Sequence, residues 1–163
     1  MIRVAIVSLS DKGSKGERKD ESGGVIRDIV TGIGASVSHY ELLPDDQLLI
    51  AAALERLADS GDIDLILTTG GTGVSPRDVT PEATLGVLDR ELPGMGEAMR
   101  AASLLKTPHA MLSRAVAGIR KQTLIINLPG SPRAVRDNLS VVLPALSHAI
   151  KKIKGDASDC GGV

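Results

Sequence analysis

Residues Asp64–Gly73 and Val74–Thr84 read DLILTTGGTG and VSPRDVTPEAT, and the other segments of the chain can be placed around them. The first run is apolar, has the length of a buried strand and ends in glycines. The second opens a helix, with Thr80 as the expected N-cap and Pro81 in the first turn. A strand that leads through a glycine turn into a helix N-terminus can bind anions, because free N–H groups and the helix dipole favour negative charge. The same pattern also fits an ordinary strand-to-helix turn.

This turn does not match the two common nucleotide-binding motifs. No Gly-Lys-Ser/Thr follows the glycines, which excludes a Walker A loop, and Pro76 stands where a dinucleotide fingerprint has its third glycine. Asp78 lies in the same turn and would repel a phosphate unless a cation lay between them. The turn therefore points to Mg²⁺, a hard ion that binds one or two carboxylates together with phosphate oxygens.

The composition narrows the class of protein. The chain has 163 residues, typical of one domain, and its 42% hydrophobic content is enough for a core. Aromatic residues make up 1%, which argues against the stacking platforms of single-stranded nucleic-acid binding. A net charge of -1 shows no electrostatic footprint for DNA or a membrane surface. No apolar run has the length of a membrane span, and the single cysteine, Cys160, excludes a disulfide framework. We therefore expect a cytoplasmic protein with no nucleic-acid or membrane partner.

Hydrophobic periodicity predicts alternating strands and helices. Strands are expected at Ile2–Leu9, Ala35–Leu43 and Ile63–Thr69, and a hairpin is expected from Ser113–Ile119 and Gln122–Leu128. Helices are expected at Ser22–Ile33, Gln47–Ser60, Pro81–Leu88 (continuing, with or without a break, through Leu92-Pro93-Gly94), Met95–Leu105 and Pro132–Ile153, the last with a kink or break at Pro144. Lys12–Glu21 is expected to be a surface loop. Residues 1–154 then form one α/β domain, a three-layer α/β/α sandwich whose mostly parallel sheet carries an antiparallel edge hairpin, and residues 155–163 form a disordered tail.

The segments that follow the predicted parallel strands should meet at one rim of the sheet, where open α/β proteins bind ligands. These segments are Ser8–Asp11, Pro44–Asp45, Gly70–Gly73 and Pro129–Ser131. Two glycine turns, two helix N-termini and two or three aspartates are expected to converge there. Asp45 directly precedes a predicted helix, so on its own it also fits a simple N-cap.

Several motifs together resemble the molybdenum-cofactor biosynthesis proteins. The resemblance rests on Thr69–Gly73, Pro76–Thr84, Leu43–Asp45, Met111–Arg114 with Ala117–Arg120, and Ile126–Pro132. The chain is similar to the molybdopterin adenylyltransferases, including the G domain of gephyrin, over nearly all of its length up to about Gly155. The combination of motifs is highly specific, whereas any one segment is not.

The resemblance implies a molybdopterin-binding domain that transfers AMP from ATP to the terminal phosphate of molybdopterin, with Mg²⁺, as a homotrimer. A separate protein would insert molybdate. By motif position, Asp45 and Asp78 would be the catalytic, magnesium-binding pair. The other residues that the resemblance places in the molybdopterin and nucleotide sites are Ser8, Asp11, Gly70, Gly71, Thr72, Gly73, Ser113, Leu128, Pro129, Gly130 and Ser131.

Other polar residues are less specific indicators. Arg77, Arg114, Arg120 and Arg133 suit either phosphate neutralisation or a structural role. His39, His109 and His148 lack the spacing of metal ligands.

Two other functions fit the same residues. The chain would be a carrier or scaffold that binds molybdopterin without adenylylating it, or a related paralogue of the same fold. A pure binder of an anionic pterin gains nothing from two carboxylates at a phosphate site, and the run Pro76–Pro81 favours the adenylyltransferase. An unrelated nucleotide hydrolase is a weaker alternative, because no water-activating base stands out.

Overall fold

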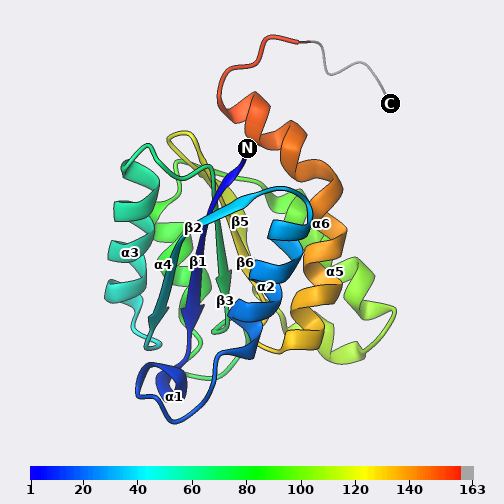
Figure 1. The fold of residues 1–163 in the computed structure, drawn as a ribbon. Coiled ribbons are helices and arrows are strands. Elements are labelled where there is room, and N and C mark those ends of the chain that lie inside the picture. The colour runs from blue at the N-terminus through cyan, green and yellow to red at the C-terminus, as the bar shows by residue number, and fades with distance from the viewer. Residues whose placement is uncertain (159–163) are drawn as a thin grey trace.

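Six strands among the described residues, 1–158, form one mixed sheet in this computed structural model (Figure 1). The strands are β1 (Arg3–Leu9), β2 (Ser36–Leu43), β3 (Leu65–Thr69), β4 (Arg90–Glu91), β5 (Ala117–Arg120) and β6 (Thr123–Leu128), in the order β2-β1-β3-β6-β5-β4. Strands β2, β1, β3 and β6 are parallel, and β5 is antiparallel to both of its neighbours. The predicted α/β class, with a mostly parallel sheet and a β5–β6 hairpin, is confirmed.

Helices cover both faces of this sheet, which gives the predicted three layers (Figure 1). They are α1 (Asp11–Ser14), α2 (Glu21–Gly32), α3 (Gln47–Asp59), α4 (Thr80–Val87), α5 (Pro93–Leu104), the 3₁₀ helix η1 (Pro108–Leu112) and α6 (Pro132–Ile153). Alternate residues of β1 face opposite layers: Val4 and Ile6 pack with α2 and α6, whereas Ala5 and Val7 pack with α3 and α4. Because the chain lacks Phe and Trp, both cores are aliphatic.

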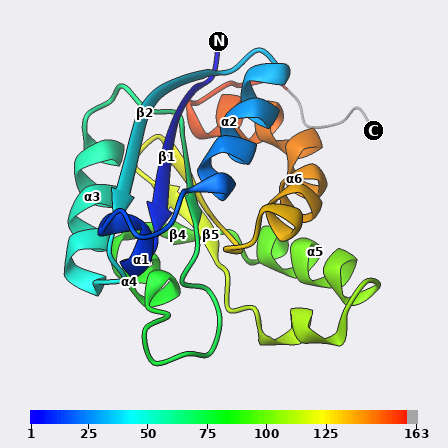
Figure 2. The same ribbon diagram turned by 60° about the horizontal axis from the view of Figure 1, so that its bottom comes forward.

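The strand register brings the predicted site segments to one rim. Ser8 of β1 lies beside Leu42 of β2 and Thr69 of β3, and Thr69 lies beside Leu128 of β6. The turns that follow these strands therefore leave the sheet at the same level. In Figure 2 this rim faces forward, with α1 and the start of α2 in front of the strand ends.

The predicted cap of α4 is wrong, for a reason that concerns the glycine turn. The helix begins at Thr80 itself, and Val79 occupies the N-cap position without a side-chain hydrogen bond. Thr80 Oγ1 instead donates to the Gly70 carbonyl at 2.9 Å. The hydroxyl therefore holds the turn against the helix rather than capping the helix.

The connection after α4 also differs from the prediction. The helix ends at Val87 and does not continue through Leu92, because the two-residue strand β4 follows and pairs with Ile119 and Gly118 of β5. Two residues are too few to show an alternating pattern, so hydrophobic periodicity carries no sign of this strand. The 3₁₀ helix η1 was also missed, because five residues are too few to show a helical period.

Two further local predictions need correction. The expected loop at Lys12–Glu21 contains most of the one-turn helix α1, whose N-cap Ser10 accepts a hydrogen bond from the Gly13 amide at 3.0 Å. Of the kink or break predicted at Pro144, the break is excluded: helix α6 is continuous there, because Val142 and Leu146 on either side are buried in the core and hold the helix to the sheet. The predicted cap of α6 is confirmed, since Ser131 Oγ accepts from the Ala134 amide.

Only part of the predicted C-terminal tail belongs to the described chain. Residues 159–163, with Cys160, lie outside it. Among residues 1–158, no helix combines the length and the apolar character that crossing a membrane requires.

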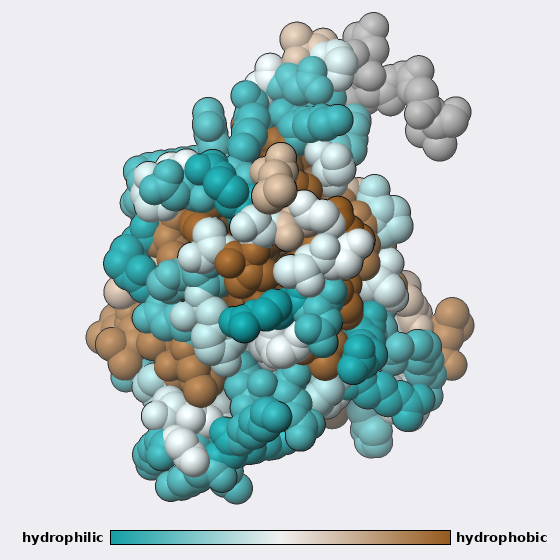
Figure 3. Space-filling view, in the orientation of Figure 1, coloured by the Kyte–Doolittle hydropathy of each residue, from teal (hydrophilic) through white to brown (hydrophobic). Residues whose placement is uncertain are grey.

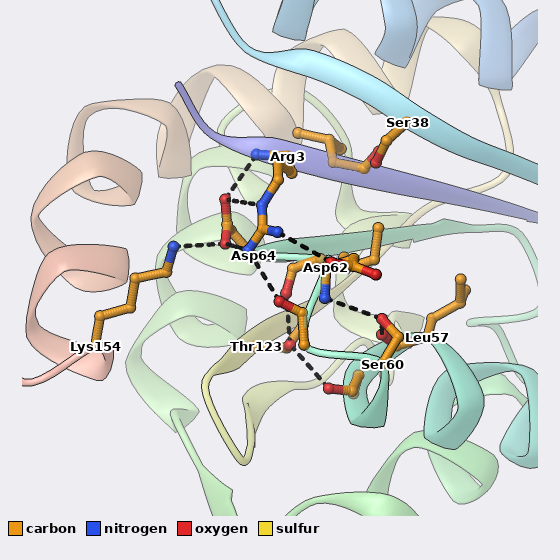
Figure 4. Close-up of polar contacts among 12 residues, drawn as sticks. Arg3, Ser38, Leu57, Ser60, Asp62, Asp64, Thr123 and Lys154 are labelled. Carbon is orange, nitrogen blue, oxygen red and sulfur yellow. Dashed lines mark hydrogen bonds and ion pairs between the residues drawn. The ribbon is translucent and has the colours of Figure 1, made fainter.

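A buried carboxylate ties the C-terminal end of α6 to the opposite rim of the sheet (Figure 4). The side chain of Asp64 is 2% exposed and accepts from the Arg3 amide at 2.8 Å and from Arg3 Nη2 at 2.8 Å. Lys154 Nζ lies 2.6 Å from Asp64 Oδ1. Burial alone would raise the pKa of Asp64, but the hydrogen bonds from Arg3 and Lys154 hold it well below its usual range.

We expect Asp64→Asn to lower the free energy of unfolding at pH 7 by about 2 kcal/mol, because Arg3 and Lys154 lose their charged acceptor. The depressed pKa means that this stabilisation is complete above the unfolded pKa of about 4 and is lost as the pH falls through the lower folded pKa. Urea unfolding at pH 7 and pH 3 measures it. Asp62→Asn is the control, since Asp62 is 85% exposed and lies 3.5 Å from the same arginine. An equal loss for Asp64→Asn at both pH values would contradict the account.

Candidate active site

A cavity of about 490 Å³ opens at the carboxyl rim of the parallel strands. Its walls come from the ends of β1, β2 and β3, the segment before α2, and the first residues of α6. The residues predicted from the sequence that line it are Ser8, Asp45, Gly70, Gly71, Asp78, Gly130 and Ser131. The rim that the sequence predicted is thus a hollow that holds both predicted carboxylates, Asp45 and Asp78, and two helix N-termini.

A second cavity of about 280 Å³ adjoins the same two turns from the side of α5 and η1. Four other predicted residues line it: Thr72, Gly73, Ser113 and Pro129. Each turn therefore contributes to both cavities, with Gly70 and Gly71 facing the first, and Thr72 and Gly73 facing the second. Sequence reasoning missed the α5, η1 and α6 residues of the second cavity, such as Thr107 and Asn138, because nothing in a single sequence places these segments together.

Two predicted residues line neither cavity. The Leu128 side chain is fully buried in the core, and only its carbonyl reaches the rim, where it accepts from the Gly70 amide at 3.2 Å. Asp11 is held by Arg77, whose Nε and Nη2 each donate to one of its carboxylate oxygens at 2.9 Å. Both residues position the site rather than border it.

Asp45 is not the N-cap of α3. That role belongs to Asp46, whose Oδ1 accepts from the amides of Leu48 and Leu49 at 3.0 Å. The Asp45 carboxylate points instead toward the glycine turn, where a Cβ on Gly71 would lie 3.1 Å from Oδ1. The simple-cap interpretation of Asp45 is therefore excluded.

The backbone around Asp45 is fixed by a reciprocal pair with Asp11. The Asp11 amide donates to Asp45 Oδ2 at 3.1 Å, and the Asp45 amide donates to Asp11 Oδ1 at 3.0 Å. Burial raises the pKa of Asp45, and the charges of Asp11 and Asp78 raise it further. The ionised carboxylate thus lies in an unfavourable environment that a cation would relieve.

Asp78 approaches the same turn from its other end. Its Oδ2 accepts from the Ser75 amide at 2.9 Å and would lie 2.9 Å from a Cβ on Gly73. The two carboxylates thus flank Gly71 and Gly73, and a Cβ on Gly71 would also overlap Thr80 Oγ1. This arrangement accounts for the glycines on either side of Thr72.

Two hydroxyls fasten the turns to each other and to α4. Thr69 Oγ1 donates to the Pro129 carbonyl at 2.7 Å, and Thr80 Oγ1 donates to the Gly70 carbonyl. Gly70 has φ +98° and Gly71 has φ +66°, values that favour glycine. The turn is therefore preformed.

Three of the four predicted phosphate-binding arginines already have partners. Arg77 makes a bidentate ion pair with Asp11. Arg114 donates to the carbonyls of Gly73 and Asp78 at 2.7 Å and also binds the Glu82 carboxylate. Arg120 lies at the far end of the antiparallel strand β5 and binds Asp59, away from both cavities. Arg114 thus holds the turn that carries Asp78. No partner is found for Arg133 within residues 1–158.

The carboxylates, not the histidines, are the candidate metal ligands. In the part of the chain that the structure describes, no group of three or more His, Cys, Asp or Glu side chains has the placement to hold a metal. His109 lines the second cavity, and His39 contacts Glu41. Two carboxylates are enough for Mg²⁺ when phosphate oxygens complete its shell. Burial and the neighbouring negative charges disfavour the ionised form of Asp45, and a second carboxylate, Asp78, lies beside the same turn. Both features fit a bound Mg²⁺.

Sequence reasoning also missed the contribution that the start of α2 makes to the site. Ser22 Oγ donates to the Gly130 carbonyl at 2.6 Å and joins this helix to the Pro129–Ser131 turn. Asp20 caps α2 by accepting from the Gly23 amide at 3.0 Å and also accepts from the Tyr40 hydroxyl. Burial and the Asp20 carboxylate raise the pKa of Tyr40 to about 12, so its hydroxyl stays a donor. The sequence signal that could have revealed this cap is Asp20, which lies just before the predicted helix.

Comparisons with known proteins agree with this geometry. Residues 5–148 match the model of a family described as a probable molybdopterin binding domain. The chain belongs to this family. The match covers every residue named above in the two cavities of this molybdopterin-binding domain.

Curated relatives carry more specific names. The molybdopterin adenylyltransferase of Helicobacter pylori strain J99 is 43% identical over 157 residues, which cover 95% of this chain and 89% of that protein. Gephyrin from Dictyostelium discoideum is 46% identical over 157 residues, covering 90% of this chain but only 22% of gephyrin. The predicted resemblance to the molybdopterin-binding family, including gephyrin, is confirmed.

A solved structure shares the fold of this molybdopterin-binding domain. The molybdopterin biosynthesis enzyme MoaB from Thermus thermophilus superposes with a TM-score of 0.90 and 52% sequence identity. The match covers 96% of this chain and 98% of that one. The three-layer architecture is therefore the family architecture.

Proposed function

We propose that this chain is a magnesium-dependent molybdopterin adenylyltransferase, which transfers AMP from ATP to the terminal phosphate of molybdopterin. The observation that carries the proposal is the placement of Asp45 and Asp78 against two glycines of one turn, in a cavity that also receives the N-termini of α2 and α6. The relatives named molybdopterin adenylyltransferase support it.

The chemistry requires little from the protein beyond positioning. An oxygen of the molybdopterin phosphate forms a bond to the α-phosphorus of ATP, the bond from that phosphorus to the β-bridging oxygen breaks, and pyrophosphate leaves. The attacking phosphate is already anionic, so no protein nucleophile is needed. Repulsion between the anions is the main obstacle, and positioning and charge neutralisation overcome it.

Several groups of this chain suit that task. The free N–H groups at the starts of α2 and α6 carry partial positive charge toward the cavity. The Asp11 amide orients Asp45, and the Ser75 amide orients Asp78. These two carboxylates would hold Mg²⁺, which when bound supplies positive charge that screens the phosphates.

The shape and charge of the second cavity suit a substrate that has a ring system beside its phosphates. Its charged residues are already paired, since Lys106 lies 2.5 Å from Asp137 and Arg100 donates to the Ala115 carbonyl at 2.8 Å. This leaves a less charged hollow next to the turns that carry the carboxylates. We place one of the two ring systems of adenylylated molybdopterin there.

The test is to mix the purified chain with molybdopterin, Mg²⁺ and ATP and to measure adenylylated molybdopterin and pyrophosphate. We expect both products from the wild type, and neither from Asp78→Ala or from a sample without metal. Tight molybdopterin binding without product would contradict the proposal and leave the carrier or the paralogue.

We also propose that the chain forms a homotrimer. Exposed apolar side chains support an assembly: Leu105 is 90% and Met111 65% exposed on the α5–η1 segment, and Leu48 is 81% exposed at the start of α3. Figure 3 shows hydrophobic surface at the lower end of α3, beside otherwise polar surface. Analytical ultracentrifugation tests this, and a monomer at micromolar concentration would contradict it. We further propose a cytoplasmic location and a separate molybdate-inserting partner.

A further inference from the structure

The end of the first cavity beside α2 contributes a helix N-terminus to the function proposed so far, but no ligand group has been assigned to it. It is formed by the segment between α1 and α2 and by the first turn of α2, and it lies across the glycine turn from the second cavity. Arg18 and Lys19 line it. Neither side chain has a hydrogen-bond or ion-pair partner within residues 1–158, in contrast to Arg77 and Arg114 at the same rim.

A buried hydroxyl at this end also lacks a partner. Ser8 is 2% exposed and lines the cavity, and its Oγ makes no hydrogen bond of good geometry to any described residue, although it lies close enough to Asp20 to lower the pKa of that carboxyl. It faces the first turn of α2, because a Cβ on Gly23 would lie 2.9 Å from Ser8 Oγ. The two polar groups beside it, the Asp20 carboxylate and the Tyr40 hydroxyl, are bonded to each other. Leaving a buried hydroxyl unpaired costs free energy, which a ligand oxygen would recover.

The helix N-terminus adds further donors. The first amides of an α-helix have no acceptor within the helix, and α2 has 12 residues over which its dipole adds up. The Ser22 side chain is taken by the Gly130 carbonyl, which fixes this end of the helix against the turn. Two unpaired cations, a helix N-terminus and an unpaired hydroxyl within residues 1–158 therefore face one hollow.

We propose that this end of the cavity binds the β- and γ-phosphates of ATP and holds the pyrophosphate that leaves. The inference rests on the proposed AMP transfer. In phosphoryl-type transfer the attacking and leaving oxygens lie roughly in line on opposite sides of the phosphorus. With the α-phosphate at Asp45 and Asp78, the second cavity lies on one side and the α2 end on the other.

The charge of the ligand agrees with this assignment. Pyrophosphate carries more negative charge than the single phosphate of molybdopterin, and the α2 end is where the unpaired cations lie. Two carboxylates lie there. Asp20 accepts hydrogen bonds from the Gly23 amide and the Tyr40 hydroxyl, whereas Glu21 has no partner among residues 1–158. Glu21 opposes phosphate binding, so its removal gives a test of the opposite sign.

Isothermal titration of ATP, AMP and pyrophosphate in the presence of Mg²⁺, without molybdopterin, tests the inference on the full chain. We expect the double variant Arg18→Gln/Lys19→Gln to weaken ATP and pyrophosphate binding by about ten- to a hundredfold, and AMP binding less than about twofold. Lys12→Gln is the matched control, since it removes a charge from the neighbouring helix α1 outside the cavity. Glu21→Gln is expected to tighten ATP binding.

Ser8→Ala provides a second variant that does not change charge. We expect it to weaken ATP binding about three- to tenfold and to leave the thermal unfolding midpoint of the ligand-free protein unchanged, because no hydrogen bond within residues 1–158 is lost. A lowered midpoint with unchanged ATP affinity would show that the hydroxyl serves the fold, and would overturn its role in the subsite.

Other outcomes separate the candidate ligands. Equal weakening of AMP and ATP, or no change beyond that of Lys12→Gln, would overturn the proposal. Loss of molybdopterin binding with ATP binding intact would assign the subsite to the pterin phosphate and would also overturn it. If ATP and pyrophosphate weaken as expected but the wild type forms no adenylylated molybdopterin, the subsite stands and the proposed activity fails.

Discussion

Asp45→Asn is expected to lower the rate of AMP transfer by about a thousandfold, the loss typical of removing one preorganised electrostatic group from an active site. The substitution keeps the size of the side chain and an oxygen that accepts from the Asp11 amide, so the loss isolates the charge. Asp46→Asn is the matched control. It changes the neighbouring residue in the same way, and Asn caps a helix as well as Asp does, so activity should stay within about twofold of the wild type.

The same substitution should make the ligand-free protein slightly more stable. Burial and the charges of Asp11 and Asp78 raise the pKa of Asp45, so the ionised form is disfavoured in the folded state. This destabilisation is absent below the unfolded pKa of about 4 and grows as the pH rises through the raised folded pKa. We therefore expect Asp45→Asn to raise the free energy of unfolding slightly at about pH 7 and not at about pH 3.5. A variant that is inactive and also less stable at neutral pH would show that Asp45 serves the fold.

Gly70→Ala is expected to destabilise the protein by about 3 kcal/mol or more, because it combines backbone strain with a steric clash. Gly70 has φ +98°, and a Cβ there would overlap the carbonyl oxygen of Leu9 in buried strand β1. Neither the strand nor the turn can move far, since the Gly70 amide donates to Leu128 and the Gly70 carbonyl accepts from Thr80. Urea unfolding monitored by far-UV circular dichroism measures the loss.

Gly86→Ala is the control for this prediction. Gly86 lies on the exposed side of α4, and a Cβ there meets no atom within 4 Å. Alanine has the higher helix propensity, so this variant should gain about 0.5–1 kcal/mol. If Gly70→Ala were as stable as Gly86→Ala, the turn would not be the rigid feature that the site requires.

The sequence alone determined the architecture and the location of the site. Short continuous apolar runs, typical of parallel strands buried on both faces, alternate with segments whose apolar residues recur with a period of about 3.6, which records the buried face of each helix. Parallel strands place their carboxyl ends at one rim, so Asp45, Gly70–Gly73 and Gly130 were expected together before any contact was known. The two adjoining cavities lined by these residues follow from that local information.

The tertiary structure alone decided which polar groups are available for chemistry. Asp45 and Asp46 are equivalent in the sequence, and only the chain path between β2 and α3 makes one the cap and frees the other. Arg77 suited a phosphate until the fold brought Asp11 to it from 66 residues away, whereas Arg18 and Lys19 are left without partners among residues 1–158. Such pairings depend on strand register and loop conformation over long sequence separations. Hydrophobic periodicity reports burial and carries no information about them.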